Sequence, residues 1–197
     1  MNRVSRRQVL AVALLCAIIL IGTSVTASNE VSLESGMRSL ARTIHLGMAI
    51  ASIGSHAPTL ADSRLLAQRL VNLLEGVDGE HYVSIDESTI FIGMIPGIAR
   101  VSARCESHGL APEVLDQVAV ASRNVSTYLQ MALESALGVL DVRGLERATR
   151  KMLAAYAYLA TVCETTCETA CDQDSVPLVP ALPTMMRLLG IGPVCTE

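Results

Sequence analysis

After residue 29, apolar residues recur every three or four positions along the chain, the spacing of one helix face. This pattern runs from Glu30 to Ala57 and stops at Pro58, because the residue before a proline is pushed out of the helical region. A second helix is predicted from an N-cap at Thr59 to Gly76, a residue type common just after a helix C-terminus. The pattern therefore predicts a helical hairpin with a very short turn. Its two apolar stripes are Leu33, Met37, Leu40, Ile44, Met48 and Ala51, and then Leu66, Leu70 and Leu73.

A different pattern fills residues 77–109, where glycines and a proline interrupt the helical spacing. We expect a long irregular crossover there, with a short helix from Ile98 to Ser107. Two further helices follow with regular 3-4 spacing, one opening at Pro112 and one running from about Gly144 to Cys171. The connection between these two helices is short, so they must be antiparallel.

Two antiparallel helical hairpins joined by a long irregular crossover predict an all-α fold, a four-helix bundle over residues 28–171. Alanines on the third and fourth stripes allow close helix approach and leave little space for a large cofactor. Residues 172–197 contain four prolines. We expect them to form a tail that wraps the bundle, with one short helix around Met185 to Leu189.

The first 27 residues have the three parts of a signal peptide. A start with three arginines and no acid precedes an unbroken apolar run from Val9 to Ile21, and small residues precede a cut after Ala27. The run is shorter than the roughly 20 apolar residues of a membrane-spanning helix. An uncleaved anchor formed by residues 8–29 is the alternative. We therefore expect export, with the protein in the periplasm or outside the cell.

The basic start Ser5-Arg6-Arg7-Gln8-Val9-Leu10 resembles the twin-arginine signal. That resemblance implies export of an already folded protein. Val9 stands where the signal usually has Phe. The alternative is an ordinary basic n-region that contains two arginines.

The composition of the chain limits the kinds of binding partner that we expect. The chain is 51% hydrophobic, 17% charged and 3% aromatic, with a formal net charge of −4. Loss of residues 1–27 removes three arginines and no acid, which takes the net charge to −7. An acidic surface with few aromatic rings disfavours nucleic acid and anionic membranes as partners. We expect a protein or small ligand in the envelope as the partner, with membrane contact only through an uncleaved N-terminal segment.

Three cysteines, Cys163, Cys167 and Cys171, recur every four residues at the end of the fourth predicted helix. On a helix this spacing puts the sulfur atoms in one row that drifts from the core edge to the flank. Three thiolates in a row could hold a soft cation, Cu(I) most naturally. The pattern resembles the cysteine-rich helices of bacterial copper-storage four-helix bundles, which implies copper binding at these residues. Those bundles line the whole core with cysteine, whereas this chain adds only Cys105 and Cys195.

Disulfides and inert buried thiols are the other interpretations of the cysteines. An exported protein meets oxidising conditions. Disulfides from Cys105 in the crossover and Cys195 in the tail would staple both segments to the end of the fourth helix. The mature chain has five cysteines, an odd number, so at least one thiol would be left over.

Histidines and acids offer weaker candidates. His45 and Met48 are of the types that ligate haem, so a haem-binding electron-transfer bundle is a further alternative. His81 and His108 have no companion ligands at a recognisable spacing. The acids of residues 75–80 are expected to form a solvated loop. Motifs of di-iron bundles, zinc proteases, serine hydrolases and phosphate loops are absent from the sequence.

Residues 41–80 resemble a helical-hairpin repeat of exported bacterial proteins, chiefly through His45 and the run Val71-Asn72-Leu73-Leu74-Glu75-Gly76. The resemblance implies an exported helical bundle and no particular activity. Leu66 to Arg69 stand where that pattern is rich in histidine. Asn72 is expected to satisfy carbonyl groups at the helix end or in the loop.

The sequence as a whole predicts an exported helical-bundle protein of the cell envelope, a non-enzymatic binding or structural module without a cofactor. Copper binding by Cys163, Cys167 and Cys171 is the first alternative. A haem-carrying bundle is the second.

Overall fold

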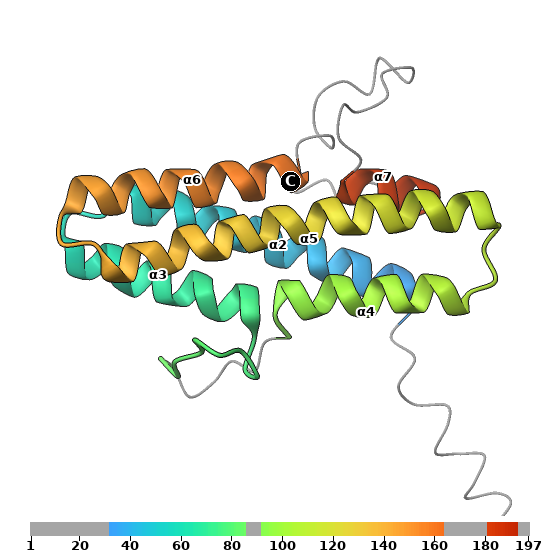
Figure 1. Ribbon diagram of the computed structural model, residues 1–197, viewed down its shortest axis with the longest axis horizontal. Helices are drawn as coiled ribbons and strands as arrows, with labels where there is room; N and C mark the ends of the chain where they lie inside the picture. Colours follow the sequence, from blue (N-terminus) through green and yellow to red (C-terminus); the bar gives the residue numbers. More distant parts are fainter. Residues whose placement is uncertain (1–31, 86–91, 164–180, 193–197) are drawn as a thin grey trace, which may run out of the picture. The chain divides into compact units, whose positions relative to one another are not determined.

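The computed structural model describes residues 32–85, 92–163 and 181–192. Within these ranges the regular structure is helical, which confirms the all-α class (Figure 1). The predicted signal peptide and three of the cysteines, Cys167, Cys171 and Cys195, lie outside the described residues. The chain divides into two units, Met1–Ser32 and Leu33–Glu197. The described helices all belong to the second: α2 (Leu33–Ser55), α3 (Leu60–Glu75), α4 (Met94–Ser107), α5 (Pro112–Asp141), α6 (Leu145–Cys163) and α7 (Leu182–Leu188).

The first predicted hairpin is confirmed as α2 and α3. The Thr59 hydroxyl caps α3, since its oxygen accepts from the Asp62 N–H at 3.1 Å and its proton is donated to the Asp62 carboxylate at 2.6 Å. At the other end, Gly76 adopts a φ of 80°, and its N–H donates to the Asn72 carbonyl. Glycine suits this position because residues with a Cβ rarely adopt positive φ.

The second predicted hairpin is α5 and α6, which run antiparallel across a short turn (Figure 1). Pro112 occupies the start of α5, where its missing N–H has no intrahelical partner to lose. Arg64 of α3 reaches the turn and donates a hydrogen bond of 2.7 Å to the carbonyl of Val142. The structure describes α6 as far as Cys163.

The crossover over residues 77–109 is more regular than the sequence indicates. Helix α4 begins at Met94, before the expected start at Ile98, and ends at Ser107 as expected. Its first turn contains Pro96, where the absence of an N–H is tolerated. Helix α4 buries Met94, Ile98, Val101 and Cys105. The expected helix from Ile98 to Ser107 is confirmed, and the expectation of an irregular segment is wrong only for residues 94–97, because a helix with glycine and proline in its first turn still buries an apolar face.

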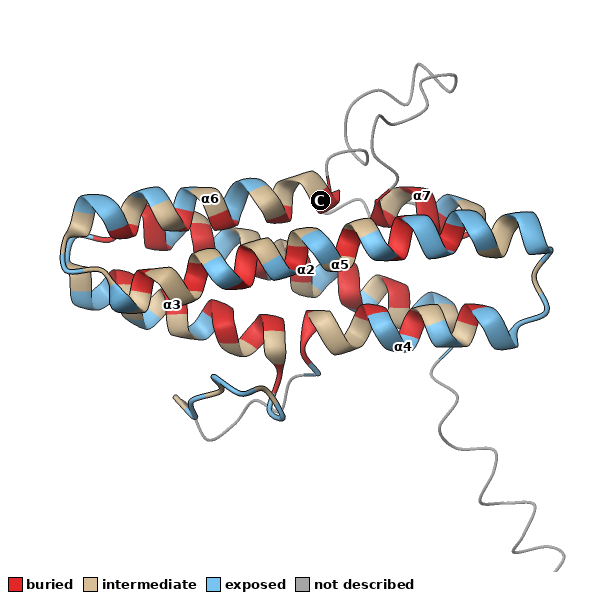
Figure 2. Ribbon diagram, in the orientation of Figure 1, coloured by how far each residue is buried: buried red, intermediate tan, exposed pale blue. Residues whose placement is uncertain are grey.

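The core lies between the helices and consists almost entirely of aliphatic and methionine side chains (Figure 2). Helix α5 packs against α3, α4, α6 and α7, and α2 packs against α3, α4 and α6. Two glycines of α2 let side chains come close. A Cβ added at Gly47 would lie 2.8 Å from the Met94 methyl group, and one added at Gly54 would collide with the Met152 methyl group. No helix among the described residues has both the length and the apolar character needed to span a membrane.

Candidate functional site

The end of α3 meets the segment that leads into α4 at a short junction. Gly76, directly after α3, forms an isolated antiparallel bridge with Ile92. Next to Ile92, Gly93 packs so closely that an added Cβ would collide with the carbonyl group of Glu75 and the amide nitrogen of Gly76. The two helix ends therefore touch backbone to backbone.

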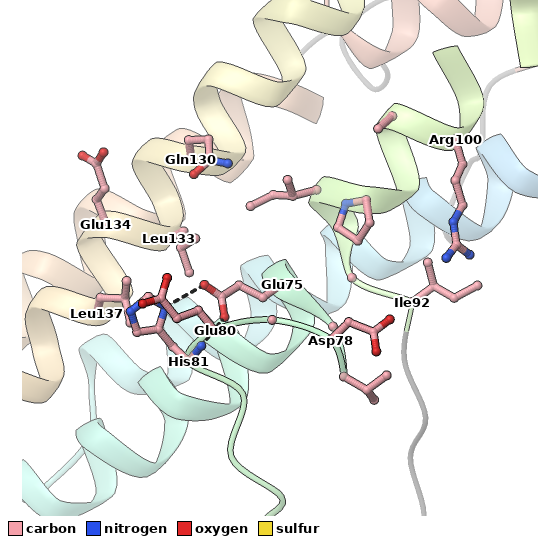
Figure 3. Close-up of a pocket in the computed structure, with 17 residues that line it drawn as sticks. Glu75, Asp78, Glu80, His81, Ile92, Arg100, Gln130, Leu133, Glu134 and Leu137 are labelled. Carbon is pink, nitrogen blue, oxygen red and sulfur yellow. Dashed lines mark hydrogen bonds and ion pairs between the residues drawn. The ribbon is translucent and has the colours of Figure 1, made fainter. Parts of the chain in front are cut away.

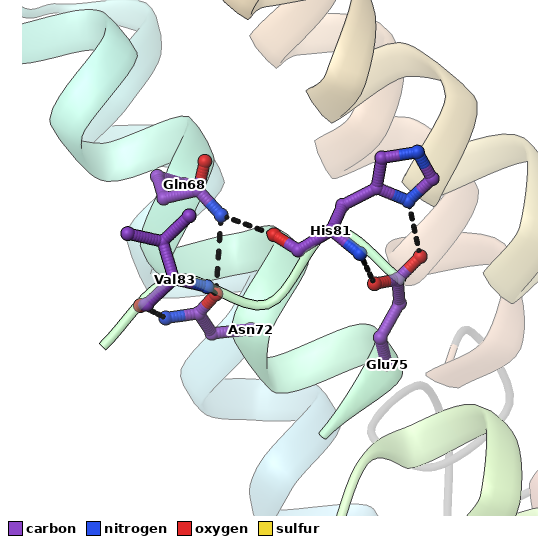
Figure 4. A network of polar contacts seen from close by, with 5 residues as sticks. All are labelled: Gln68, Asn72, Glu75, His81 and Val83. Atoms are coloured by element: carbon purple, nitrogen blue, oxygen red, sulfur yellow. Dashed lines mark hydrogen bonds and ion pairs between the residues drawn. The ribbon is translucent and has the colours of Figure 1, made fainter. Parts of the chain in front are cut away.

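Residues 77–83, which we call the strap, are hydrogen-bonded back to α3 (Figure 4). The Asn72 side chain forms a pair of hydrogen bonds with the backbone of Val83, as a peptide group does in a sheet. Its amide donates to the Val83 carbonyl at 2.6 Å, and its oxygen accepts from the Val83 N–H at 3.1 Å. One turn earlier, the Gln68 amide donates to the His81 carbonyl at 2.8 Å and to the Asn72 side-chain oxygen at 3.1 Å. The polar face at the end of α3 thus fixes the path of the strap.

A contact between ionisable side chains joins Glu75 to His81 in the strap. One Glu75 carboxylate oxygen accepts from the His81 backbone N–H at 2.8 Å, and the other lies 2.8 Å from His81 Nδ1. The Glu75 side chain is only 10% exposed, whereas that of His81 is 44% exposed. A Cβ at Gly79 would collide with the Glu75 side chain, so glycine there lets the strap close over the carboxylate.

The pKa of His81 lies above its ordinary value of 6.5. The hydrogen bond from its ring to Glu75 is the largest cause; desolvation opposes it, and the negative charges of Glu75 and Glu80 add to the increase. These acids stabilise the imidazolium form relative to the neutral ring.

A cavity of about 650 Å³ lies between the strap, the first turns of α4 and the middle of α5 (Figure 3). Ligand-binding pockets of proteins have volumes of roughly 300–1,000 Å³ and combine apolar walls with a few polar groups. This cavity has both. Its apolar lining includes Val77, Ile92, Ile95, Leu133 and Leu137, and its polar lining includes Asp78, Glu80, His81, Arg100, Gln130 and Glu134.

The fold and this site define an all-helical protein with a ligand-sized cavity at a helix junction. No protein-family model matches the chain, and no curated protein or solved structure shows significant similarity to it.

The structure places one member of the predicted cysteine row. Cys163 is buried at the last residue of α6, and burial raises its pKa to about 11. Cys105 is buried in α4, and desolvation raises its pKa as well. A raised pKa disfavours the thiolate form that binds metals and reacts. This environment favours the interpretation of inert buried thiols for both residues.

The cysteine row cannot be assembled from the described residues, since Cys167 and Cys171 lie outside them. Within the part of the chain that the structure describes, no three His, Cys, Asp or Glu side chains gather as a metal site. Cys105 and Cys163 are not joined to one another by a disulfide. The predicted disulfides of Cys195 involve a residue outside these ranges.

The remaining histidine candidates lie apart from the cavity. His45 and Met48 are half-buried on α2, with Met48 packed against the core. His108 follows α4, and its Nδ1 lies 3.1 Å from the Arg104 carbonyl oxygen, which is an ordinary helix-end contact.

Sequence reasoning missed the pair of Glu75 and His81. It left His81 without a companion and expected the acids of residues 75–80 to be solvated, which is wrong for the nearly buried Glu75. The signal that could have found the pair is the glycines at 76 and 79, which let the chain turn back on the helix end. The interpretation of Asn72 as a residue that satisfies the loop is confirmed.

Proposed function

We propose that the protein is an exported, non-enzymatic binding module of the cell envelope whose ligand site is the cavity at the junction of α3 and α4. The observation that carries this proposal is the cavity itself, an open pocket of about 650 Å³ bordered by three separate segments of the chain. Apolar side chains and several polar groups meet around this one space, which is the composition of a ligand pocket.

The lining indicates a small amphipathic ligand. Ile95 of α4 and Leu133 and Leu137 of α5 form an apolar wall that suits a hydrocarbon group. Gln130 and Glu134 are exposed at the surface of α5 beside that wall and are available to a polar group of the same molecule. Binding is favoured over catalysis because both oxygens of Glu75 accept hydrogen bonds from His81 and are used to hold the strap.

The four-helix bundle and the export signal belong to the same proposal. The hairpins α2–α3 and α5–α6 pack against each other through α2 with α6 and α3 with α5, as two hairpins of a bundle do. The basic start, apolar run and small residues before a cut after Ala27 support a signal peptide.

Ligand binding is tested by filling the cavity mouth with an indole ring. Ala99 is exposed on α4 and lines the cavity, whereas Ala157 is exposed on α6 and does not. The full chain and the variants Ala99→Trp and Ala157→Trp would be prepared from a bacterial envelope fraction and compared by native mass spectrometry. We expect a bound small molecule in the parent chain and in Ala157→Trp, and its loss in Ala99→Trp. A parent chain without any bound molecule, or equal occupancy in both variants, would contradict the proposal.

Export is tested separately by cell fractionation and the intact mass of the protein. The proposal expects a periplasmic chain that begins at Ser28. Replacing Arg6 and Arg7 by lysine would reveal twin-arginine transport by retention of the precursor, while normal export would favour the ordinary basic n-region. An uncleaved chain in the membrane fraction would establish the anchor formed by residues 8–29.

A further inference from the structure

We infer that the strap is a proton-controlled wall of the cavity, held closed by the contact of His81 with Glu75 and loosened when His81 loses its proton. This inference deepens the proposed function by adding control of access to the same site. Its evidence is the geometry of the strap, which does not depend on the identity of the ligand.

The strap forms one side of the cavity. Val77, Asp78, Glu80 and His81 all line it, opposite the apolar wall from α5 (Figure 3). Any outward movement of residues 77–83 therefore widens the opening. The bridge between Gly76 and Ile92 fixes the base of the strap, so movement is confined to the residues beyond it.

Three side chains of α3 hold the strap, and only one of their contacts changes charge near neutral pH (Figure 4). The amides of Gln68 and Asn72 do not titrate, so their hydrogen bonds persist at all moderate pH values. The ring of His81 does titrate in this range. Protonation gives the ring a full positive charge, so its hydrogen bond to the Glu75 carboxylate becomes an ion pair as well, which strengthens the contact.

The charges around His81 favour its protonated form in the closed strap. Glu75 faces it from α3, and Glu80 faces it from the strap itself. The other charged residues that line the cavity are Asp78 in the strap, Glu134 on α5 and Arg100 on α4. This set contains more acidic than basic residues, so their combined charge stabilises the imidazolium form of His81.

The direction of the effect follows from the linkage between proton binding and closure. The closed strap binds the proton of His81 more tightly than a released strap, in which the pKa returns to about 6.5. The added stability of the closed strap is therefore fully present below pH 6.5. It is lost as the pH rises through the raised pKa of the closed form.

Hydrogen exchange of the full chain without ligand tests this inference. Protection factors of the strap amides, corrected for intrinsic exchange rates, would be compared at about pH 5.5 and about pH 9, on either side of the histidine range. We expect protection of the His81 and Val83 amides to fall about two- to fivefold at the higher pH, the size typical of an exposed ion pair. The raised pKa values of Cys105 and Cys163 keep both thiols protonated over most of this interval.

Two variants separate the effect of the contact between His81 and Glu75 from a general effect of pH. His81→Gln keeps a side chain that can donate to Glu75 but does not titrate, so protection should become independent of pH. His108→Gln removes a histidine outside the strap and should retain the parent behaviour. Equal protection at both pH values in the parent chain would overturn the inference, as would pH dependence that persists in His81→Gln. Because no ligand is present, these outcomes are distinct from a failure of the binding experiment.

Discussion

The interface of α2 with α6 and the junction of α3 with α4 are both closely packed, but they depend on different kinds of contact. At the α2–α6 interface, Gly54 lies against the flexible end of Met152, and Gly47 lies near a methyl group of Leu159. At the junction, Gly93 lies against the rigid backbone of Glu75 and Gly76. An apolar interface can therefore adjust by rotating side chains, whereas the junction cannot adjust without separating two helices.

The two regions also differ in what they contribute. The apolar interface supplies stability that is roughly proportional to buried area and has little directional preference. The junction supplies hydrogen bonds whose net contribution to stability is about 1 kcal/mol each, but whose geometry fixes the strap. We expect substitutions in the first region to change global stability and those in the second to change local order.

The largest expected effect lies in the apolar region. Leu159 is fully buried. Leu159→Ala should lower the free energy of unfolding by about 2–5 kcal/mol, because it removes buried methyl groups and leaves a cavity. Chemical denaturation of the purified chain measures this loss. Leu65→Ala, at a position that is 45% exposed, is the control and should change stability far less. Equal losses would show that the described core is not the source of stability.

The second-largest change in stability is expected when one methyl group is added at the junction, and the same addition in the apolar region serves as the comparison. Gly93→Ala should destabilise the chain by about 1–3 kcal/mol, because the Cβ meets backbone that cannot move aside. Gly54→Ala meets the end of Met152, which can rotate, and gains roughly 0.5–1 kcal/mol from the better helix propensity of alanine. Its net effect should be small. Thermal and chemical unfolding of both variants measure the difference, and a larger loss in Gly54→Ala would reverse the comparison.

A smaller and local effect is expected at Asn72. Asn72→Asp has nearly the same shape but cannot donate to the Val83 carbonyl when ionised, and it sets two oxygens against each other. Protection of the Val83 amide from hydrogen exchange should fall, with a loss of about 1–2 kcal/mol in local stability. Amides in the middle of α5 serve as the internal control. Unchanged exchange at Val83 would mean that Asn72 does not hold the strap.

The smallest effect should be a gain. Ser63 is fully buried in α3, and its hydroxyl has no hydrogen-bond partner among the described residues. Ser63→Ala removes a buried polar group that lacks compensation, so unfolding free energy should rise by up to about 1 kcal/mol. Ser126→Ala, at a half-buried position on α5, is a suitable comparison. A loss of stability in Ser63→Ala would indicate that the hydroxyl makes a contact in solution.

The sequence predicts the apolar region well because periodicity reports directly on burial. Met37, Leu40, Ile44 and Ala51 were placed on one stripe of the first helix, and all four are buried. Two helix starts were also predicted from single residues. Thr59 caps α3 with its side chain, and Pro112 has a fixed φ that suits the start of α5.

The junction and its cavity could not be predicted in the same way, because they depend on residues brought together by the turn. His81 meets Glu75 only because the strap folds back over the end of α3. Gly93, Pro96 and Gly97 hid only the first turn of α4 from periodicity, so the predicted helix began at Ile98 and not at Met94. The contact of Gly93 with the backbone of Glu75 joins positions that no short-range pattern relates.

The bridge between Gly76 and Ile92 has a consequence for how this chain can change. Because Gly76 and Ile92 are paired, the bridge holds the two helix ends in register independently of the sequence that connects them. The entropic cost of closing such a loop grows only slowly with its length. The segment between these two residues can therefore change in length and sequence to form new binding surfaces, while the helices that form the core keep their sequence.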